Sequence, residues 1–426
     1  MFMLFGVART LVSRRSQCQP PFRFPCGRRF FQQWKRRRNP RQVADELHVP
    51  LRSVQRLYHR FDQQGEGAIV PAYDHCGQNH PNRTSQEILD KAQRLRDKHA
   101  RWGAELIRLL IPSQGGRGRL PTARTLQRHF RRQCTAPAPA GRKPQTDPPR
   151  ATRPHEVWQV DASEQMKLKT GRGVSWLRIV DEFSGAVLDT RAFEVSNFNT
   201  VSLHALRNHL RRVFSRWGRP AAFRVDNGFP FGSHGDFPPE LSLWVLGLGI
   251  EILWNPVHTP QNNGVVERSQ GVGKNWTEPE ACASARQLQK RLQKMDRIQR
   301  EAYPRVQGAS RCAAYPELAH SGRLYSHAWE QRHWSYETVL KHLSGYLVSR
   351  KASPSGHVSL YSHNYYVGQH HRGESIFVYL DPDEVRWVFT SPDGRELRTH
   401  AAHELSRRRI LKLNVTYRRP SRRQPK

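Results

Sequence analysis

Apolar positions change their spacing several times along this 426-residue chain, and each change predicts a different kind of structure. Between residues 28 and 66 they fall at helical spacing, and His48–Pro50 breaks the pattern. This predicts two short helices joined by a turn, the second spanning Leu51–Phe61. A second helical segment follows at 84–133. Its helices are expected at residues 85–95, 102–111 and 121–130, with Thr122 capping the last.

The pattern changes between residues 155 and 280, where short apolar runs of strand length alternate with longer helical patterns. The expected order is strand, strand, strand, helix, strand, helix, strand, helix, with Ser184-Gly185 as the turn of a hairpin. Strands mixed with crossover helices predict an α/β layered fold with a mixed sheet. A connector at 281–345 contains a charged helix over Gln287–Tyr303, which could dock on this core or pair with another protomer.

Beyond Gly356 the spacing changes to two, which is typical of strands. Five short strands separated by turn residues predict a small SH3-like β-barrel over residues 346–411. The remaining segments contain no periodic apolar pattern. They are a basic arm at 1–27, a linker with six prolines at 134–154 and a basic tail at 412–426.

Charge narrows the range of partners. The formal net charge is +34 and the isoelectric point is about 10.9, which predicts a polyanionic partner, most simply nucleic acid. The excess is uneven, since residues 155–270 contain twelve Lys and Arg and twelve Asp and Glu. A balanced core flanked by basic segments fits an enzyme that grips double-stranded DNA outside its catalytic domain.

The spacing of the cysteines and the length of the apolar runs argue against a zinc-binding protein and a membrane protein. The cysteines lack paired metal spacing, and we expect reduced intracellular thiols in a cytoplasmic, nucleoid-associated protein; they are Cys18, Cys26, Cys76, Cys134, Cys282 and Cys312. The cluster His75–His80 has no second Cys-x-x-Cys half, so no zinc is expected. The apolar start Met1–Val7 is far shorter than the roughly 20 residues of a membrane helix, so no membrane partner is expected.

Three carboxylates carry the candidate chemistry. Asp161 ends the apolar run that starts at His155, and Asp226 ends a second run and precedes the turn Asn227-Gly228. Glu267 follows a Gly/Asn turn at the expected start of a helix. Each acid taken alone is most simply a solvated turn residue. Acids at the ends of two strands and on a following helix are, however, how a sheet builds a divalent-metal site.

The surrounding residues resemble the RNase H-like core shared by retroviral integrases and bacterial insertion-sequence transposases of the DDE type. The resemblance is carried by Trp158–Asp161, Val225–Gly228 and Pro260–Arg268, and it extends to Lys274 on the same helix. The segment between Asp226 and Glu267 is longer than is usual in this family. Gly271 and Gly273 weaken the helix that is expected to carry Glu267 and Lys274.

The resemblance implies an enzyme, a polynucleotidyl transferase that cuts and joins DNA, with Asp161, Asp226 and Glu267 holding two Mg²⁺ or Mn²⁺ ions. It implies a homo-oligomer on DNA and a base at Lys274 that contacts DNA. Helix-turn-helix units would locate the terminal repeats of a mobile element through exposed polar side chains. The candidate contacts are Arg52, Ser53, Gln55 and Arg56 in the first unit, and Arg124, Gln127 and Arg128 in the second.

Two alternatives stay open. A domesticated DNA-binding regulator could keep the fold with a silent core, although such a core has no need of three converging acids. A simple RNase H-like nuclease is the other, but it needs neither paired helix-turn-helix units nor a terminal barrel. If the three acids do converge, their mutual repulsion predicts that at least one has a raised pKa without metal.

Overall fold

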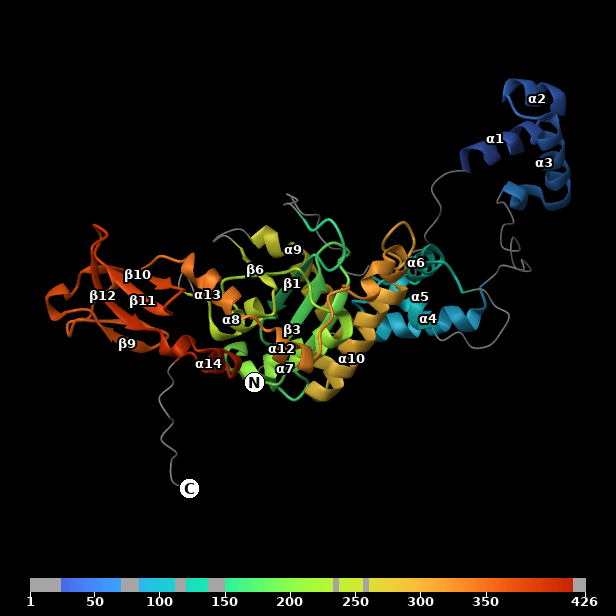
Figure 1. Ribbon diagram of the computed structural model, residues 1–426. Coiled ribbons are helices and arrows are strands. Elements are labelled where there is room, and N and C mark those ends of the chain that lie inside the picture. Colours follow the sequence, from blue (N-terminus) through green and yellow to red (C-terminus); the bar gives the residue numbers. More distant parts are fainter. Residues whose placement is uncertain are drawn as a thin grey trace, which may run out of the picture. The chain divides into compact units, whose positions relative to one another are not determined.

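The computed structural model describes residues 24–69, 84–111, 120–136, 150–232, 237–255 and 260–416, without the side chains of residues 24–28 and 260–261. The chain forms two compact units, one on each side of the Ser85-Gln86 bond (Figure 1). The cluster His75–His80, much of the proline-rich linker and most of both basic ends lie outside the described residues. No helix in the described ranges is long and apolar enough to cross a membrane.

The first unit is a group of three helices, α1 (Phe24–Lys35), α2 (Pro40–Glu46) and α3 (Leu51–Gln64), followed by the 3-10 helix η1 (Gly65–Ile69). The side chain of Asn39 caps α2 by accepting a hydrogen bond from the Arg41 amide at 2.9 Å. Small size limits the core to a few apolar side chains, chiefly Phe30, Val43, Val54 and Phe61. The two predicted helices and their short turn are therefore present.

The second helical segment belongs to the larger unit. It contains α4 (Gln86–Lys98), α5 (Ala104–Leu110) and α6 (Ala123–Arg132). Thr122 caps α6 as predicted, since its hydroxyl accepts from the Thr125 amide at 3.2 Å. The Trp102 indole donates to the carbonyl of Trp276 at 3.2 Å, and His99 contacts Glu278 at 2.6 Å. These contacts join the segment to the central domain.

The central domain is built on a mixed sheet, as the sequence predicts, and the sheet has six strands rather than the five expected (Figure 1). The hydrogen-bonded order is β2-β3-β1-β5-β6, with β4 paired to the free side of β3. Strands β1, β5 and β6 are parallel, and the remaining pairs are antiparallel. The strands are β1 (Val157–Ala162), β2 (Met166–Lys167), β3 (Gly173–Asp181), β4 (Val187–Phe193), β5 (Ala222–Val225) and β6 (Glu251–Trp254).

Helices cover both faces of this sheet. One face carries α7 (Leu203–Trp217) and α8 (Glu240–Gly247), which pack on apolar strand residues such as Trp158 and Phe223. The other face carries α9 (Gly264–Thr277) and α10 (Ala285–Arg297). Because strand side chains alternate between faces, neighbouring residues of β1 contact different helices.

The free edge of β4 is covered by side chains of α10 and of the π-helical turn η6 (Ile298–Ala302) that continues it. Gln289 donates to the Thr190 carbonyl and accepts from the Ala192 amide, both at 2.8 Å. Gln299 accepts from the Val187 amide at 3.1 Å. These bonds saturate an edge that could otherwise pair with another strand. The predicted charged helix therefore docks on the core.

Shorter elements complete the connector. They are α11 (Arg311–Ala314), α12 (His327–His333) and α13 (Tyr336–Ser344). Besides η1, the 3-10 helices of the described residues, in the core, the connector and the C-terminal region, are η3 (Phe198–Thr200), η4 (Pro260–Asn263), η5 (Pro279–Ala281), η7 (Pro316–Ala319), η8 (Gln369–His371) and η9 (His403–Leu405).

The structure does not confirm the predicted C-terminal SH3-like barrel. The strands form a four-stranded sheet, β12-β11-β10-β7, and a separate β8-β9 hairpin, and within the described residues they do not close into a barrel. In the described residues β7 pairs with β10 and β12 pairs with β11, so β7 and β12 are the two edges of an open sheet. The elements are β7 (Val348–Lys351), β8 (His357–Leu360), β9 (His363–Tyr366), β10 (Ser375–Asp381), β11 (Arg386–Thr390), β12 (Glu396–Ala401) and the helix α14 (Arg407–Leu411).

Candidate active site

Asp161 lies near the end of β1 on the face that α9 covers. In the antiparallel pair with β3 it stands opposite Arg178, and paired residues share a face. The amide of Gln270, on α9, donates to the Asp161 carboxylate and to its backbone carbonyl, each at 3.2 Å. Asp161 is therefore held between a strand and a helix, and its side chain is half-buried.

Asp226 directly follows β5, the strand that lies parallel to β1. Its side chain is exposed and accepts from the Gly228 amide at 3.2 Å, as expected for an acid that starts a tight turn. The side chain of Asn227 donates to the Asn255 carbonyl beyond β6 at 2.8 Å. This bond ties the turn to the next strand, so the position of Asp226 is set by two neighbouring strand ends.

Glu267 lies in the first turn of α9, where a carboxylate is favoured by the helix dipole. The helix starts one residue after Asn263, as the Gly/Asn turn predicts. Partial burial raises the pKa of Glu267. The structure thus carries the third acid on the helix that packs over Asp161.

The charges of Asp226 and Glu267 act on Asp161. The pKa of Asp161 is raised to about 7, mainly by burial and further by the charges of Asp226 and Glu267, while the Gln270 hydrogen bond opposes the shift. The predicted raised pKa is therefore confirmed, although desolvation rather than repulsion is its largest cause. In the described ranges, however, no three His, Cys, Asp or Glu side chains are close enough to form a metal cluster.

A buried glutamine that is not among the predicted site residues positions this site. Gln159 is fully buried in β1 and faces α9, two residues before Asp161. Its amide donates to Glu182 at 2.7 Å and to the Asn262 carbonyl at 2.9 Å, and it accepts from the Val266 amide at 2.9 Å. It therefore caps the start of α9 one residue before Glu267. The available signal was a polar residue in an apolar strand, on the same face as Asp161.

Arg178 fixes the middle of α9. Its guanidinium is 2% exposed, donates to the backbone and the hydroxyl of Ser269 at 2.9 Å each, and contacts Asp296 at 3.2 Å. Burial lowers the pKa of Arg178 and raises that of Asp296. A Cβ at Gly273 would lie 2.5 Å from the Arg178 guanidinium. Gly273 weakens the helix but is required there, because the Arg178 side chain leaves no room for a Cβ.

The remaining candidates are spread over several elements. Lys274, implied by the resemblance as a DNA contact, is near the end of α9 and pairs with Glu164 at 3.2 Å. The helix-turn-helix candidates are all exposed, on α3 at Arg52, Ser53, Gln55 and Arg56, and on α6 at Arg124, Gln127 and Arg128. In the part of the larger unit that the structure describes, none of the α6 candidates forms a hydrogen bond or an ion pair with the three acids. Cys134, Cys282 and Cys312 are free.

No family model matches the chain. Three solved retroviral integrase structures are similar to it. A simian T-cell lymphotropic virus intasome shares 19% identity over 55% of this chain and 76% of its own, with a TM-score of 0.33. The HTLV-2 integrase catalytic core domain in complex with magnesium shares 20% identity over 38% and 96%, with a TM-score of 0.29. The BIV integrase catalytic core domain shares 17% identity over 39% and 97%, with a TM-score of 0.29. Values this low establish neither family nor activity, which must be argued from the side chains.

Proposed function

We propose that this protein is a transposase that cuts and joins DNA strands at the ends of a mobile element, in the manner of bacterial insertion-sequence enzymes. The observation that carries the proposal is the isolation of its acids. The chain has 70 Lys and Arg, yet in the described residues none of Asp161, Asp226 and Glu267 forms an ion pair with one. Neighbouring acids left unpaired in so basic a protein mark a place for another cation.

The chemistry of the donor set fits a divalent metal. Asp161, Asp226 and Glu267 would hold two Mg²⁺ or Mn²⁺ ions, because carboxylate oxygens are the ligands these ions prefer. When bound, such a pair activates the attacking hydroxyl and stabilises the leaving oxygen of a phosphodiester. The chain itself supplies the frame, since Gln159, Gln270 and Arg178 hold α9 against β1 and β3.

DNA recognition belongs, on this proposal, to the helical segments and the basic ends. The exposed side chains of α3 would meet bases or phosphates, with Val54 and Phe61 buried behind them in the helix core. The exposed side chains of α6 would act likewise, with Lys274 next to the reacting strand. We further propose that the protein works as an oligomer on DNA, in the nucleoid.

Single substitution of the three acids tests the proposal. Asp161→Asn, Asp226→Asn and Glu267→Gln should each lower metal-dependent cleavage and strand transfer by more than about 100-fold, since even residues that only support metal ligands cost 10–100-fold. DNA affinity should stay within about twofold, because the phosphate grip lies elsewhere. Both are measured on duplexes carrying the repeats that flank the gene.

Glu164→Gln is the matched control, because this acid lies close in the sequence but is 89% exposed and pairs with Lys274. It should leave cleavage nearly unchanged. Strand transfer retained by Asp226→Asn would remove that residue from the site. Wild-type protein that binds the repeats but never cleaves them in Mg²⁺ or Mn²⁺ would favour a DNA-binding regulator.

A further inference from the structure

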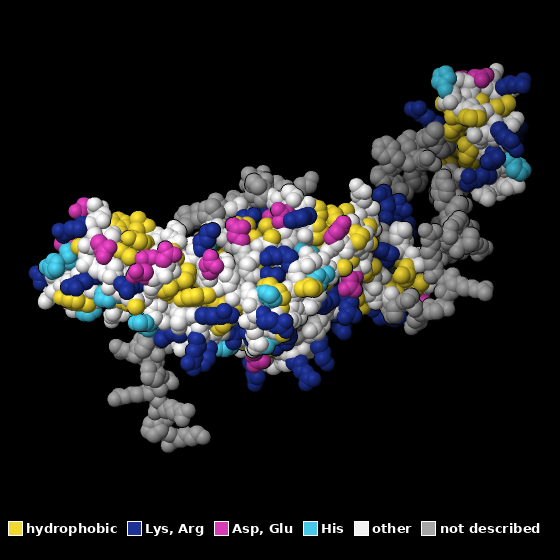
Figure 2. Space-filling model, in the orientation of Figure 1, with side chains coloured by type: hydrophobic (Ala, Val, Ile, Leu, Met, Phe, Trp, Pro, Cys, Tyr) yellow, Lys and Arg dark blue, Asp and Glu magenta, His cyan; other side chains and the backbone are white. Residues whose placement is uncertain are grey.

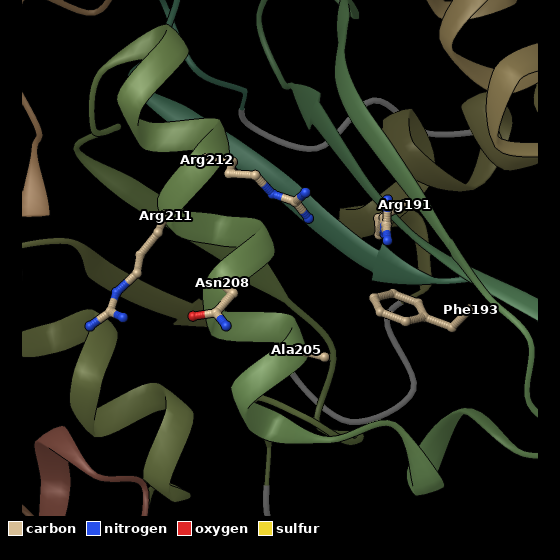
Figure 3. Close-up of a pocket in the computed structure, with 6 residues that line it drawn as sticks. All are labelled: Arg191, Phe193, Ala205, Asn208, Arg211 and Arg212. Carbon is tan, nitrogen blue, oxygen red and sulfur yellow. The ribbon is translucent and has the colours of Figure 1, made fainter. Parts of the chain in front are cut away.

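A hollow of about 490 Å³ opens between α7 and β4, away from the three acids. Its lining is basic and contains no carboxylate: Arg191, Phe193, Ala205, Asn208, Arg211 and Arg212 (Figure 3). The whole of α7 contains four arginines and no Asp or Glu. Figure 2 shows Lys and Arg side chains projecting along the lower margin of the view, where Figure 1 places α7. The core is neutral in sum, but its charges are separated in space.

The arginines of the hollow differ in their partners. Arg211 points away from Arg191 in Figure 3 and is neutralised by Glu330, with a two-pronged contact at 2.6 and 3.0 Å. Arg212 extends toward Arg191 in Figure 3, and the charges of both act on His209. Among the residues that the structure describes, neither guanidinium has an ion-pair or hydrogen-bond partner. Two converging cations repel each other unless an anion lies between them.

A β-bulge places Arg191 in this hollow. Ile179 pairs with Asp189 but Val180 pairs with Val187, so Leu188 is an extra residue in β4. After the bulge, Arg191 and Phe193 face α7. Thr190 and Ala192 instead meet Gln289 of α10 through their backbones.

Two routes connect the hollow with the segments that carry the acids, although the Asp161 side chain lies on the opposite face of the sheet, which α9 covers. Arg191 stands opposite Leu177, which stands opposite Ala162, the neighbour of Asp161. Two strand spacings separate the backbones of Arg191 and Ala162 by roughly 10 Å.

The second route is a row of aromatic rings. Phe193 meets Phe198 at 5.9 Å between ring centres, and Phe198 meets Phe229 at 6.1 Å. Phe229 lies three residues after Asp226. The wall of the hollow therefore continues to the turn that carries the second acid.

We propose that this hollow binds a backbone phosphate of the DNA on which the protein acts. A phosphate oxygen can accept from two guanidiniums at once, and Asn208 adds an amide donor. The nearest competing anion is weak: Asp189 is one-third exposed, 3.7 Å from His209, and its pKa is raised to about 6 by burial and by Asp296. The proposal rests on the proposed function for the neighbouring reaction, but the binding step itself needs no metal.

The test measures DNA binding by the full chain without metal, in EDTA, over a series of salt concentrations. Arg191→Ala/Arg212→Ala should reduce the slope of log affinity against log salt by about 1, the loss of one phosphate contact. Arg286→Ala/Lys290→Ala, which removes two exposed charges from α10, is the matched control. Equal changes in both variants would overturn the proposal, because net charge alone would then explain them.

Arginine labelling of the wild-type protein gives a second readout that no folding defect can mimic. Short duplex DNA should protect Arg191 and Arg212 from phenylglyoxal but leave Arg286 reactive. No protection by DNA, or protection only by polyglutamate or by inorganic phosphate, would overturn the assignment to a DNA backbone. If DNA protects Arg191 and Arg212 from phenylglyoxal but the protein does not cleave DNA, the result counts against the proposed function and not against this phosphate site.

Discussion

The two faces of the central sheet are built on different principles. On the face covered by α7 and α8, the strands contribute Trp158, Phe223 and other apolar residues; Phe214 of α7 stacks on Trp158 and lies tilted against Phe223, with ring centres about 6 Å apart. On the face covered by α9, β1 and β3 contribute Gln159, Asp161 and Arg178 beside apolar residues such as Trp176 and Val180. Here buried hydrogen bonds add to the apolar contacts and hold α9.

The difference in contacts indicates what each face of the sheet does. Apolar contacts are non-directional, so the α7 face can stabilise the sheet without fixing any atom closely. Hydrogen bonds to buried polar groups are directional and costly to break, so the α9 face holds one helix in one position. That helix carries Glu267, and its position relative to Asp161 decides whether the acids can share a metal. Stability is concentrated on one face and geometry on the other.

The largest expected effect comes from the apolar face. Phe214→Ala should lower the free energy of unfolding of the larger unit by about 3–5 kcal/mol, because it removes a fully buried ring and leaves a cavity. Denaturant unfolding followed by tryptophan fluorescence measures the loss. The first helical unit has its own core and should unfold unchanged. A loss below about 1 kcal/mol would contradict the assigned role of this face.

Arg178→Met should lower the free energy of unfolding by about 3 kcal/mol, because it leaves Asp296 buried without its Arg178 partner. This is the lower end of the range for a broken buried ion pair, since the charge of Arg300 still acts on Asp296. Arg178→Met/Asp296→Leu should recover most of the stability, because no buried charge is then unpaired. Strand transfer should stay impaired in the double variant, since α9 has lost its hydrogen bonds to β3. Recovery of both stability and activity would show that the network does not position Glu267.

His209 is a buried polar exception on the apolar face, and its pKa is lowered to about 3 by burial, with Arg212 and Arg191 adding to the shift. In the unfolded chain His209 is protonated below about pH 6.5, whereas in the folded chain it stays neutral down to about pH 3. The free energy of unfolding therefore falls as the pH drops from 6.5 toward 3. The loss should reach about 2 kcal/mol at pH 5, and His209→Gln should remove it. If the free energy of unfolding of His209→Gln fell with decreasing pH as steeply as that of the wild type, the loss would not come from His209.

Asp189 gives the opposite sign and serves as the control. Its folded pKa of about 6 exceeds the ordinary value, so the folded chain holds the proton more tightly and stability falls as the pH rises from about 4 to 6. Asp189→Asn should therefore raise stability at neutral pH and leave the acid-side loss from His209 in place.

The smallest effect is expected inside α9. Gly273→Ala should destabilise by about 1 kcal/mol, because displacing the Arg178 guanidinium outweighs the better helix propensity of alanine. Gly271→Ala, whose added Cβ would meet nothing within 4 Å, should instead stabilise by about 0.5–1 kcal/mol. In the Arg178→Met background, Gly273→Ala should also become stabilising. Equal effects of the two glycine substitutions would disprove the steric argument.

Local patterns determined the elements and the places of the acids. The α/β order, the hairpin at Ser184-Gly185, the cap at Thr122 and the position of Asp226 directly after a strand are all properties of neighbouring residues. Periodicity reports such properties because a helix or strand sets the spacing of its own buried side. The closure of the C-terminal barrel is not confirmed, and local patterns do not determine it because it depends on pairing between distant edge strands.

Only the tertiary structure decided what surrounds the acids. Gln159 meets Val266, Gln270 meets Asp161, and Arg178 meets Ser269 and Asp296, across 91 to 118 residues of sequence. No spacing rule links residues so far apart, because each contact exists only once the sheet order has brought β1 and β3 beneath α9. The same holds for Arg191 and Arg212, which converge because a bulge turns β4 and α7 crosses it. The sequence supplied the reactive groups, and packing supplied their partners.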